Sequence, residues 1–244
     1  IFNPGKIVDT PPMDTMLRYT PGQQTPSFDT VFRFHKQDIL QHAEQCNGSG
    51  DCRKSHLSGG TMCPSFMATR NEKDSTRARA NILREFLTHS DKINRFDHQE
   101  IYEVMDLCLS CKGCKSECPS NVDVAKLKAE FLQHYYESHG VPLRTLLIAW
   151  LPRISIIGKL FRPVTNFITG TTVFKKMIGF STLRNVPPIS PETLKSWEKR
   201  RKSSANNSSG KKKINLFADE FTNFNESDIG IKAILLLEKL GYKV

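Results

Sequence analysis

The sequence predicts a mainly α-helical protein whose C-terminal end is the start of an α/β domain. Three observations support this fold class. Apolar residues recur at helical spacing on both sides of two cysteine-rich loops. Short apolar stretches alternate with basic residues over 143–184, which is typical of short amphipathic helices. Beyond residue 213, an apolar run precedes a helical pattern, as in a βα unit that has no partner of its own.

Composition limits the possible classes of protein. The chain has 244 residues, enough for one or two domains, and seven cysteines, an odd number that argues against a secreted disulfide framework. Its net charge of +10 would suit binding to a polyanion, an anionic membrane or an acidic partner.

The longest apolar run, Leu146–Leu151, is too short to cross a bilayer. We therefore expect a cytoplasmic protein, with a peripheral position at the inner face of the membrane as an alternative. The chain starts with Ile1 and shows no signal region, so we expect an internal piece of a longer polypeptide.

The chain divides into five predicted segments. Residues 1–31 contain five prolines and little periodicity, so they read as an extended linker. Residues 32–142 form a small helical domain, and 143–198 form a basic amphipathic helical connector. Residues 199–213 are a flexible basic linker. Residues 214–244 are the truncated beginning of an α/β domain of cysteine-rich type, with a strand at Ile214–Phe217, a helix at 228–240 and a second strand from Tyr242.

The helices of the 32–142 domain are placed by their periodicity and caps. A first short helix lies within 32–43. Asp74 or Ser75 caps a second helix that runs to about Thr88. A third helix leads to the second cysteine run, and a fourth follows Pro119 and ends at Gly140. The residues predicted to face inward on the second helix are Ala78, Ile82, Leu83, Phe86 and Leu87, and on the fourth Val122, Val124, Leu127, Phe131, Leu132 and Tyr135.

The second cysteine run carries the strongest chemical signal. Cys108, Cys111, Cys114 and Cys118-Pro119 have the spacing C-x2-C-x2-C-x3-C-P, by which bacterial ferredoxins hold [4Fe–4S] clusters; the fourth cysteine there binds the other cluster of a pair. We expect Gly113 to let the backbone curl close to the cluster and Pro119 to open the next helix. A zinc site is the alternative, although zinc sites usually pair two cysteine knuckles that lie far apart in sequence.

The first cysteine run is an incomplete copy of the second. Cys46, Ser49 and Cys52 repeat the first three positions with serine in the middle, and Cys63-Pro64 repeats the end. If the fourth ligands are exchanged, Cys108, Cys111, Cys114 and Cys63 hold one full [4Fe–4S] cluster, and the remaining thiolates are those of Cys46, Cys52 and Cys118. Three thiolates suit a [3Fe–4S] cluster. The alternative is a second [4Fe–4S] cluster in which serine oxygen or water binds the fourth iron.

Several simpler interpretations also stay open at this point. Cys46 and Cys52 could be buried free thiols, and Ser49 only a turn former. Arg77, Arg79 and Arg84 could steer an anionic partner or simply form a solvated helix face. The seven histidines show no metal spacing, so surface and capping roles are the default. The 143–184 face could dock on a neighbouring domain or contact a membrane surface.

These residues resemble one family. The stretches 46–54, 62–65, 68–69 and 75–80 and the run ending at Pro119 are similar to the iron–sulfur part of large FAD-linked oxidases fused to a ferredoxin module, such as D-lactate dehydrogenases, glycolate oxidase and D-2-hydroxyglutarate dehydrogenase. Residues 3–9 resemble the junction that leaves the flavin domain of that family. The resemblance implies an α-helical two-cluster ferredoxin module, an upstream FAD domain and a downstream cysteine-rich domain in one polypeptide.

The resemblance also implies a function. Flavin takes a hydride from a D-2-hydroxy acid, and the clusters pass its electrons to a quinone, a cytochrome or a soluble carrier. This segment would then be the electron-transfer part of an oxidoreductase, with no catalytic residue of its own. Two rivals remain: an iron–sulfur subunit of a membrane quinone-reducing complex, and a structural zinc module with a basic nucleic-acid-binding surface.

Overall fold

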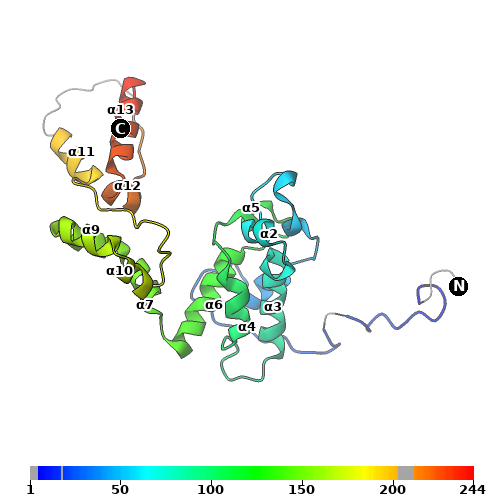
Figure 1. The fold of residues 1–244 in the computed structure, drawn as a ribbon. Coiled ribbons are helices and arrows are strands. Elements are labelled where there is room, and N and C mark those ends of the chain that lie inside the picture. Colours follow the sequence, from blue (N-terminus) through cyan, green and yellow to red (C-terminus); the bar gives the residue numbers. More distant parts are fainter. Residues whose placement is uncertain (1–4, 18, 203–211) are drawn as a thin grey trace. The chain divides into compact units, whose positions relative to one another are not determined.

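The computed structural model describes residues 5–17, 19–202 and 212–244, and it forms two compact units, Ile1–Gly140 and Val141–Val244 (Figure 1). The described part of the chain is mainly α-helical, as predicted. Where the sequence predicted two strands, it has only a parallel bridge between Lys213 and Lys243. The α/β domain is therefore not shown, because a single bridge leaves both segments without the further strands that a sheet requires.

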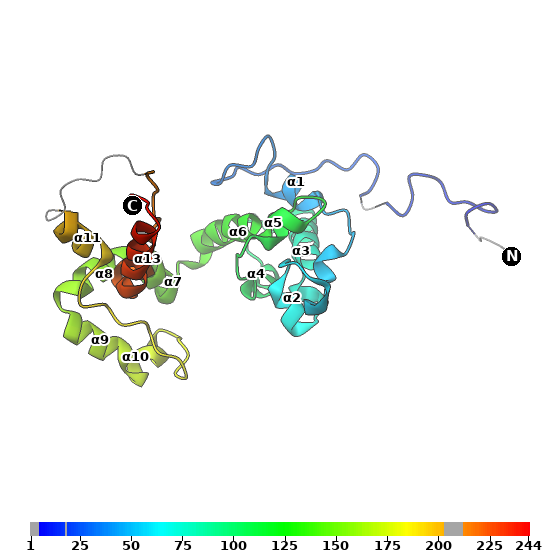
Figure 2. The ribbon, with the colours of Figure 1, turned by 90° about the horizontal axis from the view of Figure 1, so that it is seen from above.

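The first unit is built on helices that pack against one another (Figures 1 and 2). α1 and α6 both contact α3, and α3 also contacts α4. The α-helices of this unit are α1 (Ile39–Glu44), α2 (Pro64–Thr69), α3 (Thr76–His89), α4 (Gln99–Asp106), α5 (Gly113–Glu117) and α6 (Val124–His139), with short 3₁₀ turns at Asp51–Arg53, His56–Ser58 and Glu72–Asp74. Their buried apolar residues form one core that also contains Cys46, Cys52, Cys63 and Cys114.

Caps define where these helices begin and end. The Ser75 hydroxyl accepts the Ala78 N–H and starts α3, as predicted. The helix predicted within 32–43 is shorter, because Asp38 and Gln41 form a capping box that starts α1 only at Ile39. Gly140 follows the last residue of α6, also as predicted.

One prediction about the second cysteine run is wrong. Pro119 does not open a helix, because it lies in a turn closed by the Asn121 N–H on the Cys118 carbonyl, and α6 begins only at Val124 after its cap Asp123. Pro64 takes that role instead, at the first position of α2. That Gly113 lets the backbone curl close to a cluster stays a prediction. A Cβ there would lie 3.0 Å from the Thr61 carbonyl oxygen, so glycine permits close packing between two segments.

The segment before α1 contains no helix among its described residues, yet part of it is fastened to the first unit. The buried Glu130 carboxylate accepts the Val31 N–H at 2.8 Å and the Phe32 N–H at 2.9 Å. Phe28 packs edge-on against Phe96, with ring centroids 5.3 Å apart. Residues 5–17 are exposed.

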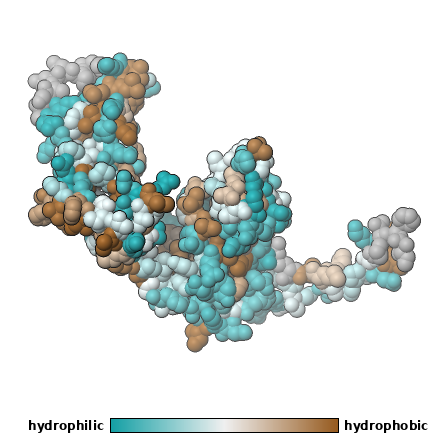
Figure 3. Space-filling view, in the orientation of Figure 1, coloured by the Kyte–Doolittle hydropathy of each residue, from teal (hydrophilic) through white to brown (hydrophobic). Residues whose placement is uncertain are grey.

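The second unit consists of seven described helices with little interior. They are α7 (Leu143–Ala149), α8 (Leu151–Leu160), α9 (Arg162–Gly170), α10 (Thr172–Met177), α11 (Leu194–Lys202), α12 (Glu220–Phe224) and α13 (Ser227–Lys239). Many of their apolar side chains are exposed, and hydrophobic surface is visible in Figure 3. α11 runs to Lys202, so residues 199–202 of the predicted linker are helical; residues 203–211 lie outside the described part. α13 agrees with the helix predicted at 228–240.

Candidate iron–sulfur site

Four of the predicted ligands line one pocket of the first unit. The pocket is bounded by Cys63, Cys108, Cys111 and Cys114, together with Arg79 and the first residues of α6. These are the four thiols that the exchanged-ligand interpretation assigns to one [4Fe–4S] cluster. Cys63 and Cys114 are buried, Cys108 is partly buried and Cys111 is exposed.

Cys63 is held in position by its backbone and by two polar neighbours. Its φ of 60° is left-handed, and Pro64 starts α2 directly after it. Its Sγ lies 3.0 Å from the Asp74 carbonyl oxygen and 3.7 Å from Nη1 of Arg79. The turn therefore brings the thiol back onto the start of α3, although the cysteine is far in sequence from the second run.

The loop between α4 and α5 carries the next two thiols. Ser110 and Lys112 have φ values of 53° and 62°, so the backbone is left-handed at two positions within the C-x2-C-x2-C run. Lys128 of α6 donates from Nζ to the Cys108 carbonyl at 2.8 Å and fixes the start of this loop. Burial lowers the pKa of Lys128, whereas the neighbouring Cys108 and Asp106 act to raise it.

Cys114 lies beneath the N-terminus of α6. Burial raises the pKa of its thiol, while the backbone N–H groups of Val124 and Ala125 hydrogen-bond the sulfur and lower the pKa. Free N–H groups at a helix start favour negative charge, so this position suits a thiolate that a metal has deprotonated.

The thiols of the first run are also buried. Cys52 Sγ accepts the Arg77 N–H at 3.3 Å. Burial raises the pKa of the Cys52 thiol, and the nearby thiols of Cys63 and Cys46 raise it further. Ser49, the serine at the middle position, is exposed, and its N–H donates to the Asn47 side chain.

Cys118 lies at the end of α5, partly buried against the same core, and its N–H donates to the Cys114 carbonyl at 2.9 Å. Within the described ranges, no three His, Cys, Asp or Glu side chains are grouped as they would be around one metal ion. In a cluster, by contrast, each thiolate binds a different iron.

Arg79 is the site residue that the sequence interpretation missed. It was predicted on a partner-steering or solvated face, together with Arg77 and Arg84. Its side chain is only 2% exposed and lies against the cysteine pocket.

The buried face of α3 differs from the predicted one. Ala80 is fully buried too, whereas Ala78 and Ile82 of the predicted inward face are only partly buried. The buried face of α3 is thus rotated from the apolar pattern so that it includes Arg79. The clue in the sequence was an arginine placed between two alanines.

The pocket suits an anionic cluster. It combines four thiols, two N–H donors on Cys114 and a buried guanidinium whose Nη2 makes no hydrogen bond within the described part of the chain. Ligated thiolates carry negative charge, which these donors and the cation would stabilise.

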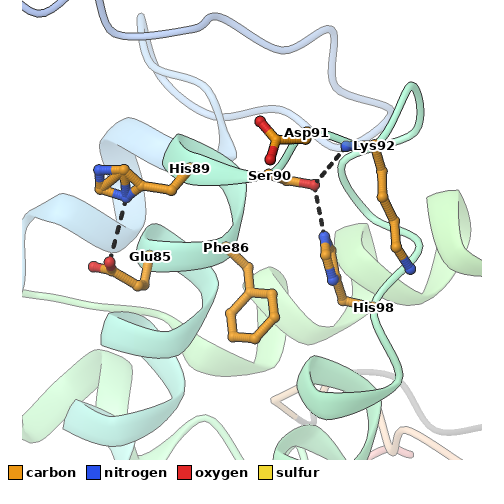
Figure 4. Close-up of a pocket in the computed structure, with 7 residues that line it drawn as sticks. All are labelled: Glu85, Phe86, His89, Ser90, Asp91, Lys92 and His98. Atoms are coloured by element: carbon orange, nitrogen blue, oxygen red, sulfur yellow. Dashed lines mark hydrogen bonds and ion pairs between the residues drawn. The ribbon is translucent and has the colours of Figure 1, made fainter.

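A second surface pocket lies at the other end of α3 (Figure 4) and contains no cysteine. There the Ser90 hydroxyl bonds Nε2 of His98 at 2.7 Å and accepts the Lys92 N–H. His89 pairs with Glu85 one turn earlier in α3. These contacts close the loop between α3 and α4, which agrees with a structural role for His98.

The comparisons with known proteins point to an iron–sulfur domain. Residues 45–123 match the family model described as a 4Fe-4S dicluster domain. Over 99% of its length the chain is 25% identical to proteins named D-2-hydroxyglutarate dehydrogenase from Escherichia coli and from Pantoea ananatis. Over 62% of its length it is 29% identical to the protein of the same name from Pseudomonas putida. No solved structure matches the chain.

The chain spans 28% of the length of the Escherichia coli and Pantoea ananatis relatives. Among the described residues, no helix is both long enough and apolar enough to cross a membrane. The predicted resemblance is confirmed: residues 45–123 match the model of a 4Fe-4S dicluster domain, and the chain resembles part of the proteins named D-2-hydroxyglutarate dehydrogenase.

Proposed function

We propose that this chain is the electron-transfer segment of a FAD-dependent dehydrogenase that oxidises a D-2-hydroxy acid. The observation that carries the proposal is the pocket lined by Cys63, Cys108, Cys111 and Cys114 inside the segment that matches the dicluster family. The names of the relatives favour D-2-hydroxyglutarate as the substrate, with D-lactate and glycolate as related alternatives. The FAD belongs to an upstream domain, and a quinone, a cytochrome or a soluble carrier accepts the electrons.

Cys63, Cys108, Cys111 and Cys114 hold a [4Fe–4S] cluster in this proposal. Such a cluster, when bound, accepts and releases one electron at a time. The chain's own groups set the conditions for that exchange. The N–H groups of Val124 and Ala125 stabilise the negative sulfur of Cys114. Lys128 holds the Cys108 backbone, and the buried core behind the loop keeps water from the inner thiols.

Cys46, Cys52 and Cys118 hold the second cluster, which we propose to be [3Fe–4S]. Ser49 stands where a fourth thiolate would bind, and the exposure of its side chain supports the absence of a strong ligand there. The Arg77 N–H on Cys52 is the kind of donor that stabilises a ligated sulfur.

Cysteine substitutions test the ligand set. The chain is prepared anaerobically, and iron, acid-labile sulfide and electron paramagnetic resonance (EPR) spectra are measured. Cys111→Ser should remove the four-iron signal and leave the three-iron signal, and Cys118→Ser should do the reverse. Stoichiometric zinc without sulfide would contradict the electron-transfer proposal and support the zinc module with a nucleic-acid-binding surface.

Ser49→Cys tests the nuclearity of the second cluster. A fourth thiolate should retain the fourth iron, so the three-iron signal of the oxidised protein should disappear and the iron content should rise. Ser55→Cys, in an exposed turn of the same loop, is the matched control and should change neither. A wild-type protein without a three-iron signal, but with the iron content of two four-iron clusters, would show that this cluster is [4Fe–4S] from the start.

The apolar face of α7–α10 supports a further part of the proposal. Residues 141–191 contain no Asp or Glu, and Leu160, Phe167 and Val173 are each more than 70% exposed. We assign this face to packing against other domains of the longer polypeptide, because the matched relatives extend far beyond the aligned region. Co-sedimentation of the full-length polypeptide with anionic vesicles at physiological salt should therefore be negligible. Binding that charge-reversal of Arg153 and Arg162 abolishes would instead favour membrane attachment.

A further inference from the structure

Arg79 is a permanent cation buried beside the cysteine pocket. Its side chain is 2% exposed. Nε donates to the Val104 carbonyl of α4 at 2.9 Å, and Nη1 donates to the Ser65 hydroxyl of α2 at 2.9 Å. Burying a guanidinium costs free energy unless an anion and hydrogen bonds compensate it. A position this deep therefore requires a negative group nearby.

The protein supplies only part of that compensation. Asp74 is the neighbouring carboxylate, but its Oδ1 lies 3.9 Å from Nη2, beyond hydrogen-bond distance. Nη2 has no hydrogen-bond partner among the described residues. The Asp74 carboxylate instead accepts the Thr69 hydroxyl at 2.8 Å. Nη1 lies 3.7 Å from Cys63 Sγ, on the side where the four thiols line the pocket.

We infer that Arg79 is the internal counter-cation of the cluster held by Cys63, Cys108, Cys111 and Cys114, and that it raises the reduction potential of this cluster. The inference rests on the proposed function. Four thiolates make the ligated cluster an anion, and reduction adds one further negative charge. A fixed cation in a low-dielectric site stabilises the reduced state more than the oxidised state. Arg79 thus makes the cluster a better electron acceptor without being a ligand.

The test compares reduction potentials in EPR-monitored titrations of the full chain after anaerobic cluster assembly. Arg79→Met keeps most of the side-chain volume and removes the charge. Arg79→Lys keeps the charge but loses the planar fork. Arg84→Met is the matched control, because Arg84 lies on the same helix, bonds Asn81 and does not line the pocket.

Arg79→Met should change the ratio of reduced to oxidised cluster at a given potential by at least tenfold, which is about 59 mV toward lower potential for one electron. Arg79→Lys should give a smaller change, and Arg84→Met none. A loaded Arg79→Met protein at the wild-type potential would overturn the inference.

If Arg79→Met does not assemble the cluster, Arg79→Lys distinguishes a role of the charge from a role of the hydrogen bonds. Assembly with a potential close to wild type supports the charge role, and loss of the cluster shows that the bonds to Ser65 and Val104 matter instead. If the wild-type chain itself takes up no cluster, the proposed function fails. That result differs from an unchanged potential, which would remove only the role of Arg79.

Discussion

The two compact units differ in how far they bury their apolar side chains. In the first unit, α1, α3, α4 and α6 bury them in one core that encloses four of the seven cysteines. In the second unit, the buried apolar residues among those described are only Ile178, Ile189, Leu194 and Ile234. The cysteine site therefore lies against a packed apolar core, whereas the second unit exposes apolar side chains that its own helices do not cover.

Truncating one phenylalanine in each unit should give the largest contrast. Phe131 is fully buried, so Phe131→Ala should lower the free energy of unfolding by about 3–5 kcal/mol. Phe167 is 75% exposed, so Phe167→Ala should change it by no more than about 0.5 kcal/mol. Urea denaturation followed by circular dichroism measures both. Equal losses would contradict the contrast between the units.

Glu130 tests how firmly the segment before α1 belongs to the first unit. Glu130→Ala leaves the Val31 and Phe32 N–H groups without their acceptor, which should cost about 1–3 kcal/mol. Limited proteolysis should then cut residues 19–38 sooner. Glu137→Ala, on an exposed position of the same helix, should leave the cleavage rate unchanged.

Helix caps offer a smaller comparison. Ser75→Ala removes the hydroxyl that accepts the Ala78 N–H at 3.0 Å and should cost about 1 kcal/mol. Thr171 caps the six-residue α10 in the same way, with Phe174 as donor at 3.3 Å. Thr171→Ala should cost less in thermal denaturation, because α10 buries little that depends on it. A larger loss of stability for Thr171→Ala than for Ser75→Ala would show that α10 belongs to a packed core.

The smallest effect concerns pH and should arise in the first unit. Nε2 of His42 accepts the Asp123 N–H at 3.0 Å, and burial followed by Lys126 lowers the pKa of His42 below 6.5. The unfolded chain therefore takes up a proton before the folded chain does. The contribution of His42 to stability is complete above pH 6.5 and is lost as pH falls through the lowered pKa.

His42→Gln should flatten this part of a plot of unfolding free energy against pH. Some dependence should remain, because burial lowers the pKa of His98 in the same direction. An unchanged slope in the variant would mean that folding does not shift the pKa of His42.

Much of the first unit could be predicted from sequence, because its signals are local. Periodicity and the Ser75 cap placed α3. The assumption that the two runs exchange their fourth ligands grouped the four cysteines that line one pocket, and their role as ligands stays a prediction. The rotation of α3 was not predictable in this way. A buried Arg79 depends on Ser65 and Val104, which lie on other helices. The strands expected near Ile214 and Tyr242 depend equally on partners, and the described chain gives them only one bridge.

Cys111 differs from the other three thiols that line the pocket, since it alone is exposed. Any species that arrives from solvent meets this sulfur first. An oxidant would react first at Cys111, and electrons would have the shortest tunnelling distance to a redox partner that binds beside it. The part of the site most open to oxidation would then also be the part best placed for electron exchange, the sulfur of Cys111.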